Sequence, residues 1–362
     1  VKSAKTPRIE ASTVLSAQLF FDLVENVTKQ VFSQASTRSH FDFEIAALKI
    51  RLLFAGESMP SLVLPALRHL QVHSNDFIPD FYIQIWDSVT SGQELPPFPG
   101  KLEDIQLRGE ITGLNDERYH SAFFPYARML SVYDTSRRTG IICTGDPQIM
   151  PAFEIACPLR SILSWILKSN SRAFIHAAAV GTKHGAVLLG GDGGAGKSST
   201  AIRSLLAGML YIGDDICCLE NRVDGSYAHS IYSSAKLHSY DVAKFPKLDR
   251  VKFINGSRPE HEKQMYFLFP FFEKQLVTTM PIRAVLIPDH TSGPLRFEKL
   301  SAVNVAQIMT ASTNCLLPRA GVETLKNIST LLQRTPCLRM HLGPDPAAVA
   351  PAIRDFLKNN CV

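Results

Sequence analysis

The chain has 362 residues, of which 45% are apolar and 20% are charged, and its formal net charge is +5. This composition allows a sizeable buried core and excludes an intrinsically disordered chain. The basic excess is small and no run of Lys and Arg exceeds two residues. We therefore expect no nucleic-acid partner, since an anionic nucleotide or an acidic peptide explains the charge equally well.

The seven cysteines are irregularly spaced and none forms a CxxC pair. This pattern favours free thiols in a reducing compartment over a zinc site or a disulfide framework. No apolar run approaches the ~20 residues that span a bilayer, and the start of the sequence lacks the basic-then-apolar pattern of a secretion signal. We expect a cytoplasmic protein without a membrane partner.

The first half of the sequence alternates between helix and strand patterns. Apolar residues recur at helical spacing over residues 15–32, and the alternating pattern over residues 81–87 is typical of a strand. The Pro-rich segment 93–100 predicts a loop. Further helices are predicted over 60–70 and 159–168, one or two strands over 43–54, and strands over 105–107, 127–133 and 139–143.

The second half opens with small apolar residues that predict two buried strands, 174–180 and 186–189, around a turn. A Gly-rich loop follows, then a predicted helix over 198–207 and a strand over 209–212. A strand over 284–287 and helices over 302–311 and 347–357 are also predicted. We expect a mixed α/β (α+β) protein. Residues 1–150 would form an N-terminal α+β domain for substrate recognition, and residues 151–362 a P-loop domain.

The Gly-rich loop fits the phosphate-binding pattern G-x-x-x-x-G-K-[ST] over residues 191–198. Glycines let the backbone turn tightly and direct its N–H groups at a polyphosphate, and the start of the next helix adds further donors. Lys197 would hold the β- and γ-phosphates of ATP, and the Ser198 hydroxyl would bind Mg²⁺. The predicted nucleotide-binding residues are Gly191, Asp192, Gly193, Gly194, Ala195, Gly196, Lys197, Ser198 and Ser199.

Two adjacent carboxylates, Asp214 and Asp215, follow the short strand after the P-loop helix. One could bind Mg²⁺ and the other could take a proton from an attacking hydroxyl. Neighbouring residues on an extended chain point to opposite sides, so we expect different roles, but the sequence does not assign them. His176 lies in the first small-residue strand, where a histidine is more often a core residue than a catalytic one.

Residues 174–219 resemble the HPr serine kinase/phosphorylase family, which shares its nucleotide core with phosphoenolpyruvate carboxykinases. The resemblance rests on His176-Ala177, the loop 191–198 and the pair Asp214-Asp215. It implies ATP-dependent phosphorylation of a serine hydroxyl, with the Asp pair supplying the base and a metal contact. It also implies that His176 assists at the transferred phosphoryl group, and it allows a homo-oligomer.

The match departs from the family pattern at Gly193, where the family has Ser, and at Ser199, where it often has Glu. The chain therefore resembles a divergent member. Residues 45–56, 86–88 and 158–160 are similar to the kinases that phosphorylate lasso-peptide precursors. This implies a peptide or protein as the acceptor, for example a ribosomally made precursor peptide.

Three basic residues are weaker candidates for substrate contacts: Lys236, Lys263 and Arg319. Each could reach a phosphate or the acceptor, although a basic residue at such a position is more often simply solvated. Two other functions compete with a peptide kinase. One is a kinase of small-molecule hydroxyls on the same core, and the other is a nucleotide-binding regulatory module without transfer.

Overall fold

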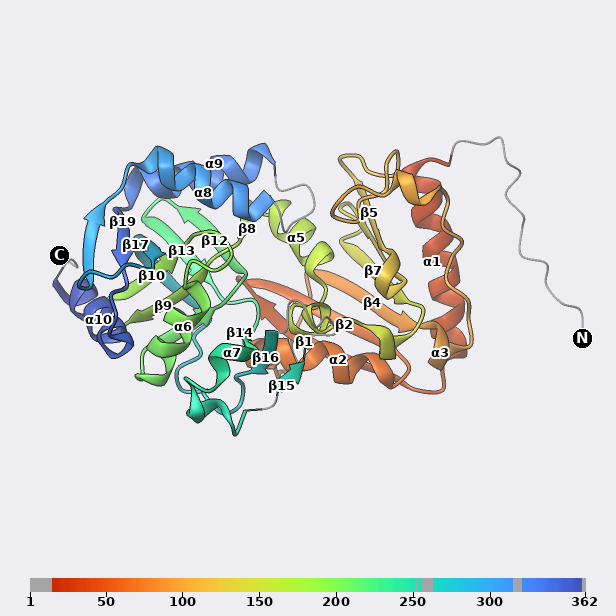
Figure 1. Cartoon of the computed structure of the whole chain (residues 1–362). Helices are drawn as coiled ribbons and strands as arrows, with labels where there is room; N and C mark the ends of the chain where they lie inside the picture. Colours follow the sequence, from red (N-terminus) through yellow and green to blue (C-terminus); the bar gives the residue numbers. More distant parts are fainter. Residues whose placement is uncertain (1–14, 252, 256–262, 315–320, 360–362) are drawn as a thin grey trace, which may run out of the picture.

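The computed structural model describes residues 15–251, 253–255, 263–314 and 321–359 (Figure 1). These residues form sheets of seven, nine and three strands with helices packed around them, which confirms the predicted mixed α/β class. Figure 1 shows the seven-stranded sheet and α1 on one side of the molecule, and the nine-stranded sheet with α8, α9 and α10 on the other. Of the helices in this part of the chain, none has both the length and the apolar composition needed to cross a bilayer.

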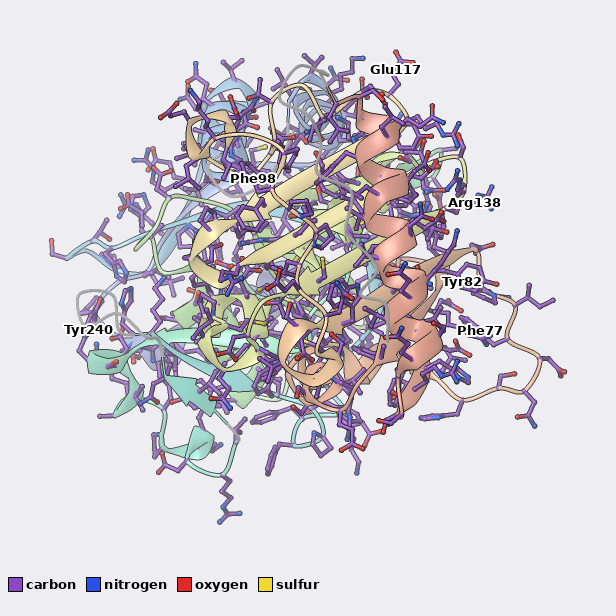
Figure 2. All side chains as sticks on the ribbon, turned by 90° about the vertical axis from the view of Figure 1, so that its right-hand side faces the viewer. Phe77, Tyr82, Phe98, Glu117, Arg138 and Tyr240 are labelled. Carbon is purple, nitrogen blue, oxygen red and sulfur yellow. The ribbon has the colours of Figure 1, made fainter. Side chains whose placement is uncertain are left out.

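The seven-stranded sheet belongs to the N-terminal half and has the order β3-β1-β2-β4-β7-β6-β5. Helix α1 lies across one of its faces (Figure 2), and α2 and α5 pack on the other. The alternation of β4 explains this arrangement, because Ile83 and Ile85 enter one core and Trp86 the other. The elements are α1 Ala17–Gln34, β1 Arg38–Ile45, β2 Leu48–Ala55, α2 Ser58–Leu67, β3 Gln71–Val72, β4 Phe81–Asp87, α3 Ser88–Ser91, β5 Tyr119–Phe124, β6 Met129–Asp134, β7 Thr139–Thr144, α4 Ala152–Ala156 and α5 Arg160–Lys168.

Most predictions for this half agree with the structure to within a few residues. The segment 43–54 falls within two antiparallel strands, β1 and β2. The strand predicted at 105–107 is wrong, because Ile105 makes only a single bridge, to Ile111, and the surrounding residues form turns. A segment of only three residues is too short to form a stable strand at this place.

The nine-stranded sheet has the order β11-β9-β10-β17-β13-β12-β8, with β19 pairing β17 and β18 pairing β19. Helices α6 and α10 pack on one face, and α8 and α9 on the other. The elements are β8 Arg172–Ile175, β9 Ala178–Thr182, β10 Gly185–Leu189, α6 Lys197–Leu206, β11 Leu210–Gly213, β12 Cys217–Arg222, β13 Gly225–His229, β17 Thr279–Asp289, β18 Arg296–Lys299, α8 Ala302–Asn314, α9 Val322–Arg334, β19 Cys337–His341 and α10 Val349–Asn359. A small sheet, β14-β16-β15, joins β14 Ser234–His238, β16 Lys263–Phe267 and β15 Phe253–Asn255, and α7 Ser239–Val242 follows β14.

The single strand predicted over 174–180 is also wrong, and the error concerns the functional region. The chain forms β8, breaks at His176 and Ala177, and then forms β9. These two strands lie near opposite ends of the sheet order although only two residues separate them, so the sheet must curl until its ends meet. We call this meeting line the seam. The link between β11 and β12, residues 214–216, crosses the same seam.

The two halves of the chain share a hydrophobic core, in which Phe174, Ile216 and Phe267 pack with residues of the N-terminal sheet. Polar contacts add to this junction. The Ser233 backbone N–H donates to the Ala66 carbonyl at 2.8 Å, and the His69 Nε2 lies 2.7 Å from the Ser230 Oγ. A domain division at residue 150 therefore stays a prediction, and the halves pack as neighbours with a common interior.

His69, at the junction of the two halves, should make the stability of the fold sensitive to acid. Burial lowers the pKa of His69 to about 3, whereas an unfolded histidine has a pKa near 6.5. Below pH 6.5 the His69 ring becomes protonated in the unfolded chain but stays neutral in the native state. The free energy of unfolding should therefore fall as the pH drops toward 3. We expect a loss on the order of 2 kcal/mol between pH 7 and pH 4.5 from this one group. Urea unfolding of the wild type and of His69→Gln at both pH values measures it. An equal pH dependence in the two proteins would contradict the assignment.

Candidate active site

The phosphate-binding loop lies between β10 and α6, in the strand–loop–helix arrangement that the sequence predicts. Three of its glycines have left-handed backbone angles, with φ of 134° at Gly191, 85° at Gly194 and 99° at Gly196. Gly196 also has no room for a side chain. A Cβ there would lie 2.9 Å from Leu342 Cδ1 and 3.2 Å from His290 Nε2. Glycine is required at this position by both backbone angle and space.

Lys197 and Ser198 begin α6 and point into different surroundings. Lys197 is only 6% exposed, and its ammonium donates to the carbonyl oxygens of Gly191 at 2.7 Å and Asp192 at 2.9 Å. Burial lowers its pKa, and the nearby carboxylates act in the opposite direction. The Ser198 Oγ donates to Asp214 Oδ1 at 2.9 Å. The start of α6 therefore holds the buried Lys197 ammonium and, beside it, the hydrogen-bonded oxygens of Ser198 and Asp214.

The two carboxylates occupy separate environments. Asp214 is 1% exposed and accepts from the Ser198 hydroxyl and, at 3.1 Å, from the Lys236 backbone N–H. Its burial, together with the neighbouring Asp215 charge, raises its pKa. Asp215 is partly exposed and faces the Lys236 Nζ at 2.5 Å and the His176 Nε2 at 3.6 Å. Burial alone would raise the pKa of Asp215, but Lys236 and His176 hold it well below its usual range.

The prediction that the Asp pair is split agrees with these contacts, but the physical reason given for it does not. Asp215 has a φ of 71° and so does not continue an extended chain. A left-handed residue two positions after β11 turns the backbone, and this turn directs the second carboxylate toward His176 and Lys236 instead of toward Ser198. Whether the two act as metal ligand and base stays a prediction.

His176 lies in the break between β8 and β9, at the seam. Its backbone N–H donates to the Thr313 Oγ1 at 3.0 Å, and Thr313 belongs to the last turn of α8. Burial lowers the pKa of His176 to about 4, although Asp215 acts to raise it, so the ring is neutral at pH 7. Its Nδ1 has no hydrogen-bond partner within the described part of the chain.

A cavity of about 580 Å³ joins these groups, which is within the range of small-ligand sites. Of the predicted residues it contains His176, most of the loop and Asp215, together with the two weaker candidates Lys236 and Lys263. Gly191, Asp192, Ala195 and Asp214 are not among its lining residues, and Arg319 lies outside the described residues. The lining is His176, Gly193, Gly194, Gly196, Lys197, Ser198, Ser199, Thr200, Arg203, Asp215, Lys236, Leu237, His238, Tyr240, Asp241, Lys244, Lys263, His290, Leu342, Gly343, Pro346 and Val349.

Sequence reasoning missed several residues of this lining. His290 directly follows β17, which runs parallel to the P-loop strand β10. Since parallel strands carry functional residues at their carboxyl ends, the predicted strand at 284–287 could have drawn attention to it. His238 and Tyr240 gave no such signal, because β14 and α7 are short and only their tertiary position brings them to the loop.

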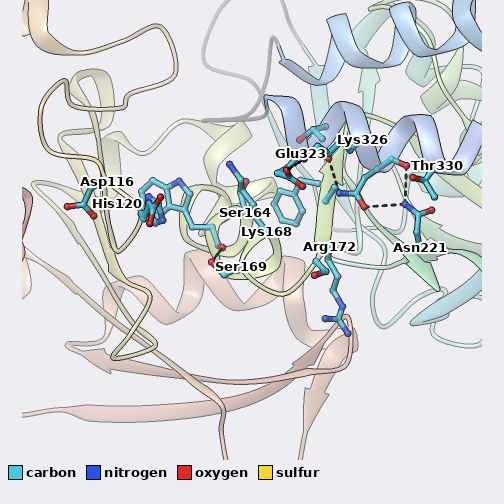
Figure 3. A pocket seen from close by; sticks show the side chains of 17 residues that line it. Asp116, His120, Ser164, Lys168, Ser169, Arg172, Asn221, Glu323, Lys326 and Thr330 are labelled. Carbon is cyan, nitrogen blue, oxygen red and sulfur yellow. Dashed lines mark hydrogen bonds and ion pairs between the residues drawn. The ribbon is translucent and has the colours of Figure 1, made fainter. Parts of the chain in front are cut away.

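A second cavity, of about 530 Å³, lies between α5, α9 and the start of β5 (Figure 3). Some of its charged and amide side chains are hydrogen-bonded to other residues of the lining. Lys326 donates to Glu323 at 2.7 Å, and Asn221 donates to the Asn327 carbonyl at 3.0 Å. It contains no residue of the phosphate-binding loop or of the acid pair. The chemistry that the sequence predicts therefore belongs to the first cavity.

Comparisons with known proteins give little further information. No protein-family model matches the chain, and no curated protein matches its sequence. Among solved structures, the chain is similar to the HPr(Ser) kinase/phosphatase from Coxiella burnetii, with 11% sequence identity and a TM-score of 0.28. This alignment covers 51% of the present chain and 94% of the Coxiella chain. So low a score does not establish a shared fold.

Proposed function

We propose that this protein is an ATP-dependent kinase that transfers the γ-phosphoryl group to a Ser or Thr hydroxyl of a peptide or protein. One observation supports this most: at the mouth of a phosphate-binding loop, one carboxylate is bonded to the loop serine and its neighbour faces the open cavity. Nucleotide binding alone needs only the first. A second, cavity-facing carboxylate is what a hydroxyl acceptor requires.

In this mechanism the loop N–H groups and Lys197 hold the phosphates, and the hydroxyl oxygen of the acceptor attacks the γ-phosphorus. The new P–O bond forms while the bond to the leaving ADP oxygen breaks. Asp215 orients the hydroxyl and takes its proton, the Lys236 ammonium keeps that carboxylate ionised, and the neutral His176 ring lies 3.6 Å from it. Catalysis then depends on positioning and charge stabilisation, as in other phosphoryl transfers.

Ser198 and Asp214 fit the role of Mg²⁺ ligands, because hard oxygen atoms from one hydroxyl and one carboxylate lie together beside the loop at 2.9 Å. When bound, Mg²⁺ would neutralise phosphate charge and favour transfer. A site of this kind takes its remaining ligands from water and the nucleotide.

A peptide acceptor is favoured by the resemblance of residues 45–56, 86–88 and 158–160 to lasso-precursor kinases. Incubation of the protein with ATP, Mg²⁺ and a lasso-type precursor peptide ending in serine tests it. We expect mass spectrometry to find one added phosphoryl group, and no addition to the same peptide with alanine in place of that serine. ATP consumption that occurs with small hydroxyl compounds but with no peptide would instead support a small-molecule kinase.

A further inference from the structure

We propose that Tyr240 forms the stacking surface for the base of the bound nucleotide, with the ring of His238 supporting it from behind. This inference rests on the proposed function, since it names the nucleoside end of the same cavity. The ligand class is a nucleobase, a flat aromatic ring that stacks on aromatic side chains.

The orientation of the bound nucleotide is set by the end of the cavity that must hold the γ-phosphate. Lys197, Asp215 and Lys236 mark that end, so the nucleoside must extend away from them. Strand β14 provides a path, because Lys236 and His238 lie two residues apart, share one side of the strand and are separated by about 6.6 Å. Both line the cavity, and Tyr240, in the first turn of α7, continues this wall.

Helix α6 leads in the same direction. The lining residues Ser199, Thr200 and Arg203 lie on one face of this helix, beyond the turn that would bind the phosphates. Arg203 is itself held over the Phe245 ring, with its guanidinium 4.8 Å from the ring centroid. The apolar residues Leu342, Pro346 and Val349 also line the cavity. In Figure 1, α6 lies between α7 and α10, whose first residue is Val349.

The ring of Tyr240 is unusually available for a residue of its type. It is 73% exposed, although it lines a cavity, and it appears at the margin of the molecule in Figure 2. Its position is nevertheless fixed on one side, because it stacks on His238 with centroids 4.9 Å apart and an interplanar angle of 12°. One face of the Tyr240 ring therefore packs on the His238 ring, and the opposite face does not contact His238. A held ring with an open face is suited to sandwich a base.

Calorimetric binding of ATP and of inorganic tripolyphosphate tests the proposal, because only ATP has a base. We expect Tyr240→Ala to weaken ATP binding roughly tenfold or more, in line with the loss of one base–aromatic stack, and to leave tripolyphosphate binding unchanged. Tyr240→Phe keeps the ring and should bind ATP as the wild type does. Tyr82→Ala, an exposed tyrosine of the N-terminal sheet, is the matched control and should change neither affinity.

Each contrary outcome has a distinct meaning. Equal ATP affinity in Tyr240→Ala and wild type, with tripolyphosphate still bound, would overturn the base site and leave the proposed kinase intact. An equal loss for both ligands would also overturn it, because the ring would then act on the phosphate site. A raised KM for the acceptor peptide without a change in ATP affinity would assign Tyr240 to the acceptor. If the wild type bound neither ligand, the proposed function itself would fail.

Discussion

Replacing Lys197 with alanine is expected to lower phosphoryl transfer by about 1,000-fold or more. Its ammonium is buried at the start of α6 and bonded to the loop carbonyls, so it is a positive charge held within the phosphate-binding loop itself. Loss of one preorganised donor to a developing negative charge typically costs a factor of 10² to 10³, and here the donor also carries a full charge. Steady-state transfer to the acceptor peptide, followed with labelled ATP, measures the effect.

Two further variants make the result specific. Lys197→Met keeps the length of the side chain without its charge and should be as inactive as the alanine variant. Lys326→Met removes a lysine that is 65% exposed on α9 and should be as active as the wild type. Thermal unfolding of all three verifies that they fold. Transfer by Lys197→Ala within tenfold of the wild type would contradict the assignment of the loop.

Asp215→Asn is expected to reduce turnover at least ~100-fold, the usual contribution of a general base, while nucleotide affinity changes little. The carboxylate faces the cavity and lies apart from the Ser198–Asp214 pair, so its loss should affect the acceptor step most. Asp214→Asn should instead raise the Mg²⁺ concentration that is needed for half-maximal activity. Parallel measurements of kcat, ATP affinity and Mg²⁺ dependence separate the two roles, and near wild-type turnover in both variants would refute them.

The Asp215 variant needs a control, because it leaves the Lys236 ammonium without its partner in a buried place. An unpaired buried charge can cost several kcal/mol of stability. The double variant Asp215→Asn with Lys236→Met removes both charges and should recover much of that stability. If it folds like the wild type and remains inactive, the loss belongs to the chemistry. Recovery of activity in the double variant would show that Asp215 is only a partner for Lys236.

The local elements of the fold could be predicted from the sequence because their signals are local. The alternation over residues 81–87 corresponds to β4 with the same bounds, and the helical spacing over 15–32 corresponds to α1 with a shift of two residues. The loop 191–198 is equally local, since glycine, lysine and serine at fixed spacing meet the needs of one strand–turn–helix unit. The Asp pair could be found because it directly follows the next strand.

What the sequence could not show is where distant segments meet. A run of small apolar residues over 174–180 is compatible with one strand, and nothing within it signals that the chain breaks at His176. The break exists because the nine-stranded sheet curls and its ends meet at the seam, which is a property of the whole sheet. Asp215 crosses the same seam, and so its carboxylate comes within 3.6 Å of the His176 ring.

The same distinction explains the remaining site residues. By itself the sequence determined that a phosphate-binding loop and an acidic pair exist, because each is built from neighbours in the chain. Only the tertiary structure decided which carboxylate faces the cavity. It also placed Lys236 against Asp215, since β14 belongs to the small sheet with β16 and not to the nine-stranded sheet that carries the loop. A salt bridge between residues 21 positions apart depends on that packing, and no periodicity of the sequence encodes it.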